Sequence, residues 1–187
     1  MNLANKLTLS RFFMIPMMLI VLSISSFQNH QLFWTLTTSE FLFALLFVLA
    51  GFTDFLDGYI ARKTQTITTF GKFLDPIADK VLVLTAFSYL LFVQIIPIWV
   101  IVIIILREFM VSGLRLIAVE EKIVISASQL GKYKTAWTML TLTYLLFEGY
   151  EWNMIVSSVL IWITVILTVS SGLEYLYKYR QVFTKQI

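Results

Sequence analysis

The sequence has 187 residues, of which 59% are hydrophobic and only 13% are charged, whereas about a quarter of the residues of soluble domains are charged. This composition predicts an integral membrane protein. At about 20 apolar residues for each membrane-spanning helix, the spans would take up nearly the whole length, so we expect no separate soluble catalytic or binding domain. The chain has no cysteine and one histidine, His30, which excludes disulfides, thiolate chemistry and histidine-rich metal sites.

Hydrophobic runs predict six transmembrane helices and therefore an all-α integral membrane protein. In chain order the runs cover residues 12–27, 41–60, 81–96, 98–119, 135–147 and 154–177. Residues 2–10 alternate apolar and polar side chains at nearly helical spacing, which predicts a short N-terminal interfacial helix, although a solvated leader would show the same pattern. No repeat or linker divides the sequence, so we expect residues 1–187 to form one membrane domain.

The basic residues are confined to alternate connections between these predicted helices. The connections at residues 28–39, 94–97 and 148–153 contain no Lys or Arg. All fourteen basic residues lie in or beside the N-terminal segment, the other two connections and the C-terminal tail. Because basic residues are retained on the cytoplasmic side of a membrane, both termini are predicted to be cytoplasmic, which agrees with an even number of spans.

All the aspartates of the chain gather in one stretch, as Asp54, Asp57, Asp75 and Asp79. The first two are three positions apart on the second predicted helix and the last two are four apart on the third, so each pair projects from one helical face. Because these helices are antiparallel neighbours with a short connection, the two pairs can meet. Four uncompensated aspartates near the hydrocarbon would cost about 10–14 kcal/mol on insertion scales. A cation must therefore lie among them.

Two kinds of cation fit this cluster. A structural network of salt bridges could use Arg62, Lys72 or Lys80, which are close in sequence. A divalent metal fits four carboxylates better, because oxygen ligands without histidine or thiolate favour Mg²⁺, Mn²⁺ or Ca²⁺ over zinc. Metal-bound carboxylates indicate phosphoryl transfer, with one carboxylate free to accept the proton of the nucleophile.

Small residues accompany the aspartates, namely Gly58, Ala61 and Gly71. They leave room either for a nucleobase or ribose against the backbone or for two helices to pack closely, and the spacing favours neither. Arg62, at the end of the second predicted helix, can pair with a phosphate, although an arginine that extends to the interface is the commoner case.

These residues form a pattern with fixed spacing, Asp54-x₂-Asp57-Gly58-x₂-Ala61-Arg62-x₈-Gly71-x₃-Asp75-x₃-Asp79. The pattern resembles, in every fixed position, the signature of the CDP-alcohol phosphatidyltransferase family. The resemblance implies a six-helix membrane enzyme, usually a homodimer, that replaces CMP on a CDP-linked lipid with an alcohol. It also implies that the four aspartates surround two Mg²⁺ or Mn²⁺ ions, that Asp79 is the catalytic general base, and that the CDP site is lined by Gly58, Ala61, Arg62 and Gly71.

Segments outside this pattern indicate the acceptor. Residues 2–11 resemble the N-x-P-N-x-L-T-x-x-R segment that opens the sequences of one bacterial branch of this family, with Ala4 in place of the proline. Residues 107–109, 112–115 and 131–135 resemble later segments of the same branch. That branch transfers the phosphatidyl group of CDP-diacylglycerol to sn-glycerol 3-phosphate for phosphatidylglycerol and cardiolipin synthesis, on the cytoplasmic side of the bacterial cell membrane. Asn5 and Thr8 would approach the nucleotide, although capping of the first helix would explain them equally.

An acceptor with a dianionic phosphate needs cationic partners. Arg107, Arg115, Lys132 and Lys134 belong to the cytoplasmic ends of the fourth and fifth predicted helices and could converge on it. Arg107 and Lys132 are the first choices, but positive-inside topology alone would also place basic residues there. Glu108 is expected to orient a basic side chain rather than to act as a base.

The remaining conspicuous residues need no chemistry beyond the membrane. Tyr175, Tyr177 and Tyr179 are expected to form an aromatic belt at the inner interface, and no nucleic-acid partner is expected.

Two alternative functions remain open. Within the same class of enzyme, the acceptor could instead be serine, inositol phosphate or phosphatidylglycerol. Outside it, intramembrane aspartates could mark a cation transporter, but the neighbouring basic residues place these aspartates towards the cytoplasmic side.

Overall fold

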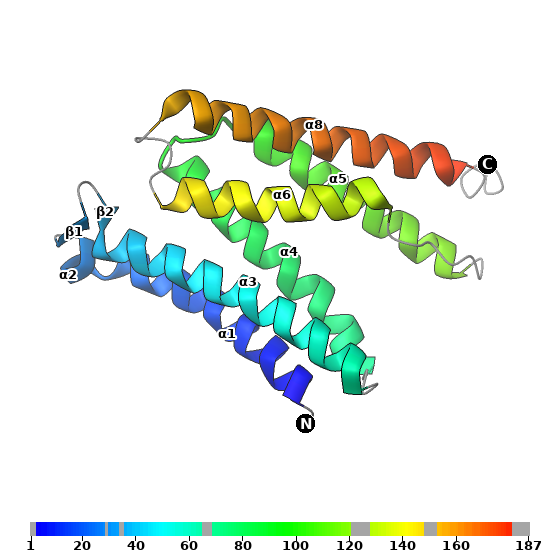
Figure 1. Cartoon of the computed structure of the whole chain (residues 1–187), viewed down its shortest axis with the longest axis horizontal. Coiled ribbons are helices and arrows are strands. Elements are labelled where there is room, and N and C mark those ends of the chain that lie inside the picture. Colours follow the sequence, from blue (N-terminus) through cyan, green and yellow to red (C-terminus); the bar gives the residue numbers. More distant parts are fainter. Residues whose placement is uncertain are drawn as a thin grey trace.

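The computed structural model describes residues 3–28, 30–33, 36–64, 69–120, 128–147 and 153–180. Helices make up nearly all of this part of the chain (Figure 1), which confirms the all-α prediction. The helices are α1 (Leu3–Ser23), α2 (Ser25–Gln28), α3 (Thr38–Thr64), α4 (Thr69–Phe92), α5 (Ile98–Glu120), α6 (Gln129–Leu146) and α8 (Met154–Lys178). Two short antiparallel strands, β1 (Gln31–Phe33) and β2 (Leu36–Thr37), lie between α2 and α3.

Polar side chains fix where two of the helices begin. Ser128 Oγ accepts a hydrogen bond from the backbone N–H of Gly131 (3.0 Å) at the start of α6. Asn153 Oδ1 accepts hydrogen bonds from the N–H groups of Ile155 and Val156 at the start of α8. These caps satisfy backbone donors that have no partner within their own helix, and the cap at Ser128 also defines one edge of the candidate site.

The helices form two flanks with α4 between them. Figure 1 shows α1 and α3 side by side on one flank and α5, α6 and α8 on the other, while α4 crosses between the two. The apolar core includes the fully buried side chains of Phe43, Phe47, Leu90, Ile104 and Leu142, which come from α3, α4, α5 and α6. Van der Waals contacts among these closely packed side chains hold α4 against both flanks.

The helix ends next to the basic connections lie towards the same end of the molecule. Figure 1 shows the start of α1, the end of α3, the start of α4, the end of α5, the start of α6 and the end of α8 on that side. The strands and the turn between α4 and α5 lie at the opposite end. The helix ends beside basic connections and those beside connections without Lys or Arg thus lie at opposite ends of the molecule, as the distribution of basic residues predicts.

Within the described residues, two helical segments are long and apolar enough to cross a membrane, Thr38–Gly58 of α3 and Met154–Lys178 of α8. Large apolar side chains elsewhere also face outwards. Phe13 is 66% exposed, Leu106 64% and Ile155 76%. An outer surface with many such side chains is suited to contact with lipid rather than with water.

Two features differ from the sequence prediction. Residues 3–10 do not form a separate interfacial helix, because α1 continues without a break from Leu3 to Ser23. Its polar residues Thr8 and Arg11 are directed to partners inside the protein rather than to an interface. The connection between α1 and α3 also contains the short α2 and the two strands, which the sequence analysis did not predict.

Candidate active site

The four aspartates come from two helices and are joined by a third. Asp54 and Asp57 lie on α3, and Asp75 and Asp79 lie in the first part of α4. Thr8 of α1 donates a hydrogen bond to Asp75 Oδ1 (2.6 Å), and its Oγ1 lies 3.4 Å from Asp57 Oδ2. Thr8 is therefore within α1 and turned towards the carboxylates, so it does not cap that helix.

Arg11, one turn further along α1, supplies the cation that the cluster requires. Its Nη2 lies 3.1 Å from Asp54 Oδ1 and 2.5 Å from Asp57 Oδ2, and its Nη1 lies 2.6 Å from Asp79 Oδ1. The Arg11 side chain is fully buried, and that of Asp57 is 7% exposed. Charge-assisted hydrogen bonds of this kind offset the cost of taking both groups out of water.

Other basic residues lie closer to the aspartates in the sequence than Arg11 does. Lys80 lies close by in sequence, but it donates a hydrogen bond to Ser112 on α5 instead. The side chains of Arg62 and Lys72 lie outside the described residues. Among the described residues, the cation that contacts the aspartates is Arg11 of α1, a helix that precedes both α3 and α4 in the sequence.

The donor atoms of the cluster suit a hard divalent cation, because all of them are carboxylate oxygens. In the part of the chain that the structure describes, no three acidic or histidine side chains converge as the ligands of a metal ion. The guanidinium of Arg11 lies among three of the four carboxylates. The residues thus fit a metal in their chemistry, and in this structure the guanidinium of Arg11 contacts three of the four carboxylates that would hold it.

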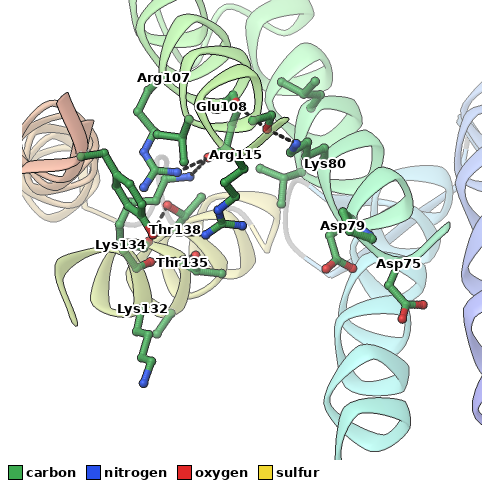
Figure 2. Close-up of a pocket in the computed structure, with 18 residues that line it drawn as sticks. Asp75, Asp79, Lys80, Arg107, Glu108, Arg115, Lys132, Lys134, Thr135 and Thr138 are labelled. Carbon is green, nitrogen blue, oxygen red and sulfur yellow. Dashed lines mark hydrogen bonds and ion pairs between the residues drawn. The ribbon is translucent and has the colours of Figure 1, made fainter. Parts of the chain in front are cut away.

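A cavity of about 900 Å³ lies beside Asp75 and Asp79. Residues of α4, α5, α6 and α8 line it. Figure 2 shows the carboxylates of Asp75 and Asp79 on one side and the side chains of Arg107, Arg115 and Lys134 across from them. The cavity therefore has an acidic wall from α4 and a basic wall from α5 and α6.

Glu108 organises part of the basic wall. Its Oε1 accepts hydrogen bonds from Lys134 Nζ (2.6 Å) and from Arg107 Nη1 (3.0 Å). Arg107 Nε also donates to Ser171 Oγ on α8 (3.2 Å). Because Lys134 is buried, its ammonium needs a partner of opposite charge. These contacts confirm the prediction that Glu108 orients basic side chains.

The four residues predicted to bind the acceptor phosphate, Arg107, Arg115, Lys132 and Lys134, all line the cavity. They are not placed equally. Lys132 is exposed, and Figure 2 shows its side chain extending away from the other basic groups. The arrangement favours the two arginines and Lys134 over Lys132, which was one of the two first choices.

Tyr175 is a residue of the site that the sequence analysis missed. It is 2% exposed and so cannot belong to an interfacial aromatic belt, whereas Tyr177 is 74% exposed. Its hydroxyl oxygen accepts hydrogen bonds from Arg115 Nη2 (3.1 Å) and from the backbone N–H of Ser128 (3.1 Å). No motif in the sequence marks Tyr175, because its place in the site depends on how α8 packs against α5.

The residues predicted to line a CDP site fall on α1, α3 and α4, the helices that carry the acidic cluster. Gly58 is partly buried on α3, and Gly71 is buried near the start of α4. Asn5, Ala61 and Arg62 belong to helices, but their side chains lie outside the described part of the chain.

Comparisons with known proteins identify the family of the chain. Residues 1–170 match the family model of the CDP-alcohol phosphatidyltransferases. The chain therefore belongs to the CDP-alcohol phosphatidyltransferase family, whose members are metal-dependent transferases of membranes. The match covers the helices of both cavity walls and most of α8, and it ends before Tyr175.

Curated relatives with one shared name cover nearly the whole chain. A CDP-diacylglycerol–glycerol-3-phosphate 3-phosphatidyltransferase of Bacillus subtilis is 38% identical in an alignment of 183 residues that covers 95% of this chain and 94% of the relative. The protein of that name from Rickettsia bellii is 39% identical over 93% of both chains. The one from Haemophilus influenzae is 36% identical over 94% of this chain and 91% of its own.

Proposed function

We propose that this chain transfers the phosphatidyl group of CDP-diacylglycerol to sn-glycerol 3-phosphate, giving phosphatidylglycerophosphate and CMP. This is the reaction of phosphatidylglycerophosphate synthases, in the synthesis of phosphatidylglycerol and cardiolipin. The names of the relatives support it along almost the whole chain. Within the structure, one observation carries it: a single cavity joins Asp75 and Asp79 to Arg107, Arg115 and Lys134.

The two walls of the cavity match the two ends of the acceptor. Glycerol 3-phosphate has a hydroxyl group that must lose a proton and a dianionic phosphate that must be held. Asp79 provides a carboxylate for the hydroxyl, and the guanidinium groups of Arg107 and Arg115 provide donors with a geometry that suits phosphate oxygens. Serine has a carboxylate but no phosphate, so it would offer this basic wall one negative charge where the phosphate offers two.

The proposed reaction is a direct displacement. The 1-hydroxyl of glycerol 3-phosphate gives its proton to Asp79, and its oxygen forms a bond to the phosphorus that carries diacylglycerol. The bond from that phosphorus to the CMP oxygen breaks, and CMP leaves with the bonding electrons. The reaction requires no covalent enzyme intermediate, which agrees with a chain that has no cysteine.

We assign two Mg²⁺ or Mn²⁺ ions to Asp54, Asp57, Asp75 and Asp79, and metal of this kind supplies charge stabilisation for the pyrophosphate and the leaving group when bound. In the structure, Arg11 forms ion pairs with three of these carboxylates. The CDP part of the donor is assigned to the α3 and α4 residues Gly58, Ala61, Arg62 and Gly71, with Asn5 and Thr8 of α1 beside them.

The proposal includes a membrane topology. α1, α3, α4, α5, α6 and α8 would be six spans of one domain, residues 1–187, in the bacterial cytoplasmic membrane, with both termini and the aspartates on the cytoplasmic side. The positions of the helix ends and the exposed apolar side chains support it. We also propose a homodimer, as the family resemblance implies, and light scattering of the protein in detergent would measure its mass.

The direct test is release of CMP by the purified protein in mixed micelles with CDP-diacylglycerol. Release should require both glycerol 3-phosphate and Mg²⁺ or Mn²⁺. Serine, inositol phosphate and phosphatidylglycerol are each tested as the acceptor in place of glycerol 3-phosphate. Equal CMP release with one of these in place of glycerol 3-phosphate would refute the proposed acceptor, and activity that survives chelation would refute the role of the metal.

A further inference from the structure

We propose that Tyr175 is a positioning residue for the phosphate of the acceptor, holding Arg107 and Arg115 in the basic wall without neutralising them. This inference rests on the proposed function, because it concerns the phosphate site of the same cavity. Tyr175 is buried on α8 and lies beyond the residues that match the family model.

The ring of Tyr175 lies close to two arginines that approach from α5. The guanidinium carbon of Arg107 is 5.7 Å from the ring centroid, and that of Arg115 is 5.8 Å away. Cations within about 6 Å of an aromatic centroid are attracted by its electron-rich face. One aromatic side chain therefore fixes two like charges that would otherwise repel each other.

The hydroxyl of Tyr175 adds direction to this attraction. It accepts a hydrogen bond from Arg115 Nη2 (3.1 Å) and another from the backbone N–H of Ser128 (3.1 Å). Ser128 is the N-cap of α6, the helix that carries Lys134. The hydroxyl thus ties the guanidinium of Arg115 to the start of α6 and fixes the spacing between two parts of the basic wall.

Tyr175 is an uncharged partner for Arg115, and this has a consequence for the charge of the basic wall. Arg107 and Lys134 share the carboxylate of Glu108, whereas no carboxylate among the described residues forms a salt bridge with Arg115, which hydrogen-bonds the phenol of Tyr175. A phenol and an aromatic face orient a guanidinium but carry no negative charge. The positive charge of Arg115 therefore remains available to a dianionic phosphate, which a carboxylate at this position would repel.

Gly172 of α8 leaves space that this arrangement needs. A Cβ there would lie 3.2 Å from Arg107 Cγ, which is closer than an ordinary van der Waals contact. The arginine stem passes over the bare backbone of α8 before its guanidinium reaches the ring of Tyr175.

The test compares Tyr175→Phe, which keeps the ring, with Tyr175→Leu, which removes it. Two quantities are measured for each purified protein: the dissociation constant of inorganic phosphate by calorimetry, and kcat and KM for CMP release with glycerol 3-phosphate as the varied substrate. For Tyr175→Phe we expect about 10-fold weaker phosphate binding and a similar rise in KM, because a hydrogen bond to a charged group is lost. The kcat and the KM for CDP-diacylglycerol should change little, and Tyr175→Leu should show the larger effect on phosphate.

Tyr177→Phe is the matched control, because Tyr177 lies on the same helix, is exposed and stacks against Arg180 rather than the cavity. It should behave as the wild type. The inference is overturned if Tyr175→Phe binds phosphate as tightly as the wild type, if the wild type binds no phosphate, or if kcat falls while both KM values stay constant, as a merely structural role would give. If phosphate binding weakens as expected but the wild type releases no CMP with glycerol 3-phosphate, Tyr175 keeps its assigned role and the proposed acceptor fails.

Discussion

Arg11 Nη1 lies 2.6 Å from Asp79 Oδ1, although the first residue belongs to α1 and the second to α4. The same guanidinium reaches Asp57 and Asp54 on α3. It is therefore the common counter-ion of three carboxylates from two helices. The carboxylate assigned as the general base is thus held by the same group that neutralises the two aspartates of α3.

The first prediction concerns stability without metal. Arg11→Met should lower the free energy of unfolding in the presence of a chelator by about 3 kcal/mol or more, because removing one partner of a buried pair leaves the other charge uncompensated. Only Asp57 is deeply buried, and Asp54 and Asp79 are about half exposed, so they add less. Thermal unfolding with chelator measures the effect, and Arg180→Met, at an exposed position of the chain, is the control. A variant at position 11 that melts like the wild type would contradict the counter-ion role.

The second prediction concerns metal affinity. If Arg11 and a divalent cation compete for the same carboxylates, Arg11→Met should bind Mn²⁺ more tightly than the wild type, and the melting temperature lost with chelator should return on addition of Mn²⁺. Titration of free Mn²⁺ by electron paramagnetic resonance measures this binding without any need for activity. Weaker binding in the variant would show that Arg11 supports the metal site rather than competing for it.

The third prediction concerns Asp79 as the base. Asp79→Asn keeps the shape of the side chain but cannot accept the proton, and removal of a general base typically costs about 100-fold or more in rate. CMP release should fall by that factor, while binding of CDP-diacylglycerol should be retained better than activity. Asp57→Ala should also lose activity, and excess Mg²⁺ should not restore it fully. Unchanged turnover in Asp79→Asn would exclude Asp79 as the base.

The sequence predicted the acidic cluster well because its members are linked by short-range helical spacing. Asp54 and Asp57, and likewise Asp75 and Asp79, share a helix face wherever the helices go. The contact between Arg11 and these residues depends on how α1 packs against α3 and α4, and no periodicity within α1 specifies that packing. A basic residue near the cytoplasmic end of a span is expected at the interface, so the sequence pattern does not indicate that Arg11 is buried.

The same limit explains Tyr175 and Lys132. Tyr175 was predicted to lie at the interface because tyrosines near a span end usually do, but the contact of α8 with α5 turns it inwards. Lys132 and Lys134 are two positions apart and so project from different sides of α6. Only the tertiary structure shows that Lys134 is the one that faces Glu108.

The fourth prediction tests the pair of Glu108 and Lys134 as a unit. Glu108→Gln should be destabilising by about 3 kcal/mol, because it leaves the buried ammonium of Lys134 without a counter-charge. Lys134→Met alone should cost less, since Glu108 keeps its hydrogen bond from Arg107. In the double variant the two losses should not add, because the buried charge that makes the first change costly is gone. Unfolding of the four proteins in one detergent gives the coupling free energy, and simple additivity would mean that the 2.6 Å contact contributes little.

The fifth prediction uses glycines to move Arg107 without changing any charge. A methyl group at Gly172 would lie 3.2 Å from Arg107 Cγ and 3.3 Å from Met110 Cε, so both side chains must shift in Gly172→Ala. We expect a KM for glycerol 3-phosphate that is raised a few-fold, with a smaller change for CDP-diacylglycerol. Gly113→Ala on α5 is the control, because a Cβ there would meet nothing within 4 Å, and alanine favours a helix over glycine by about 1 kcal/mol. Gly113→Ala should therefore be active and at least as stable as the wild type, and an equal rise in KM in both variants would show that the effect does not pass through Arg107.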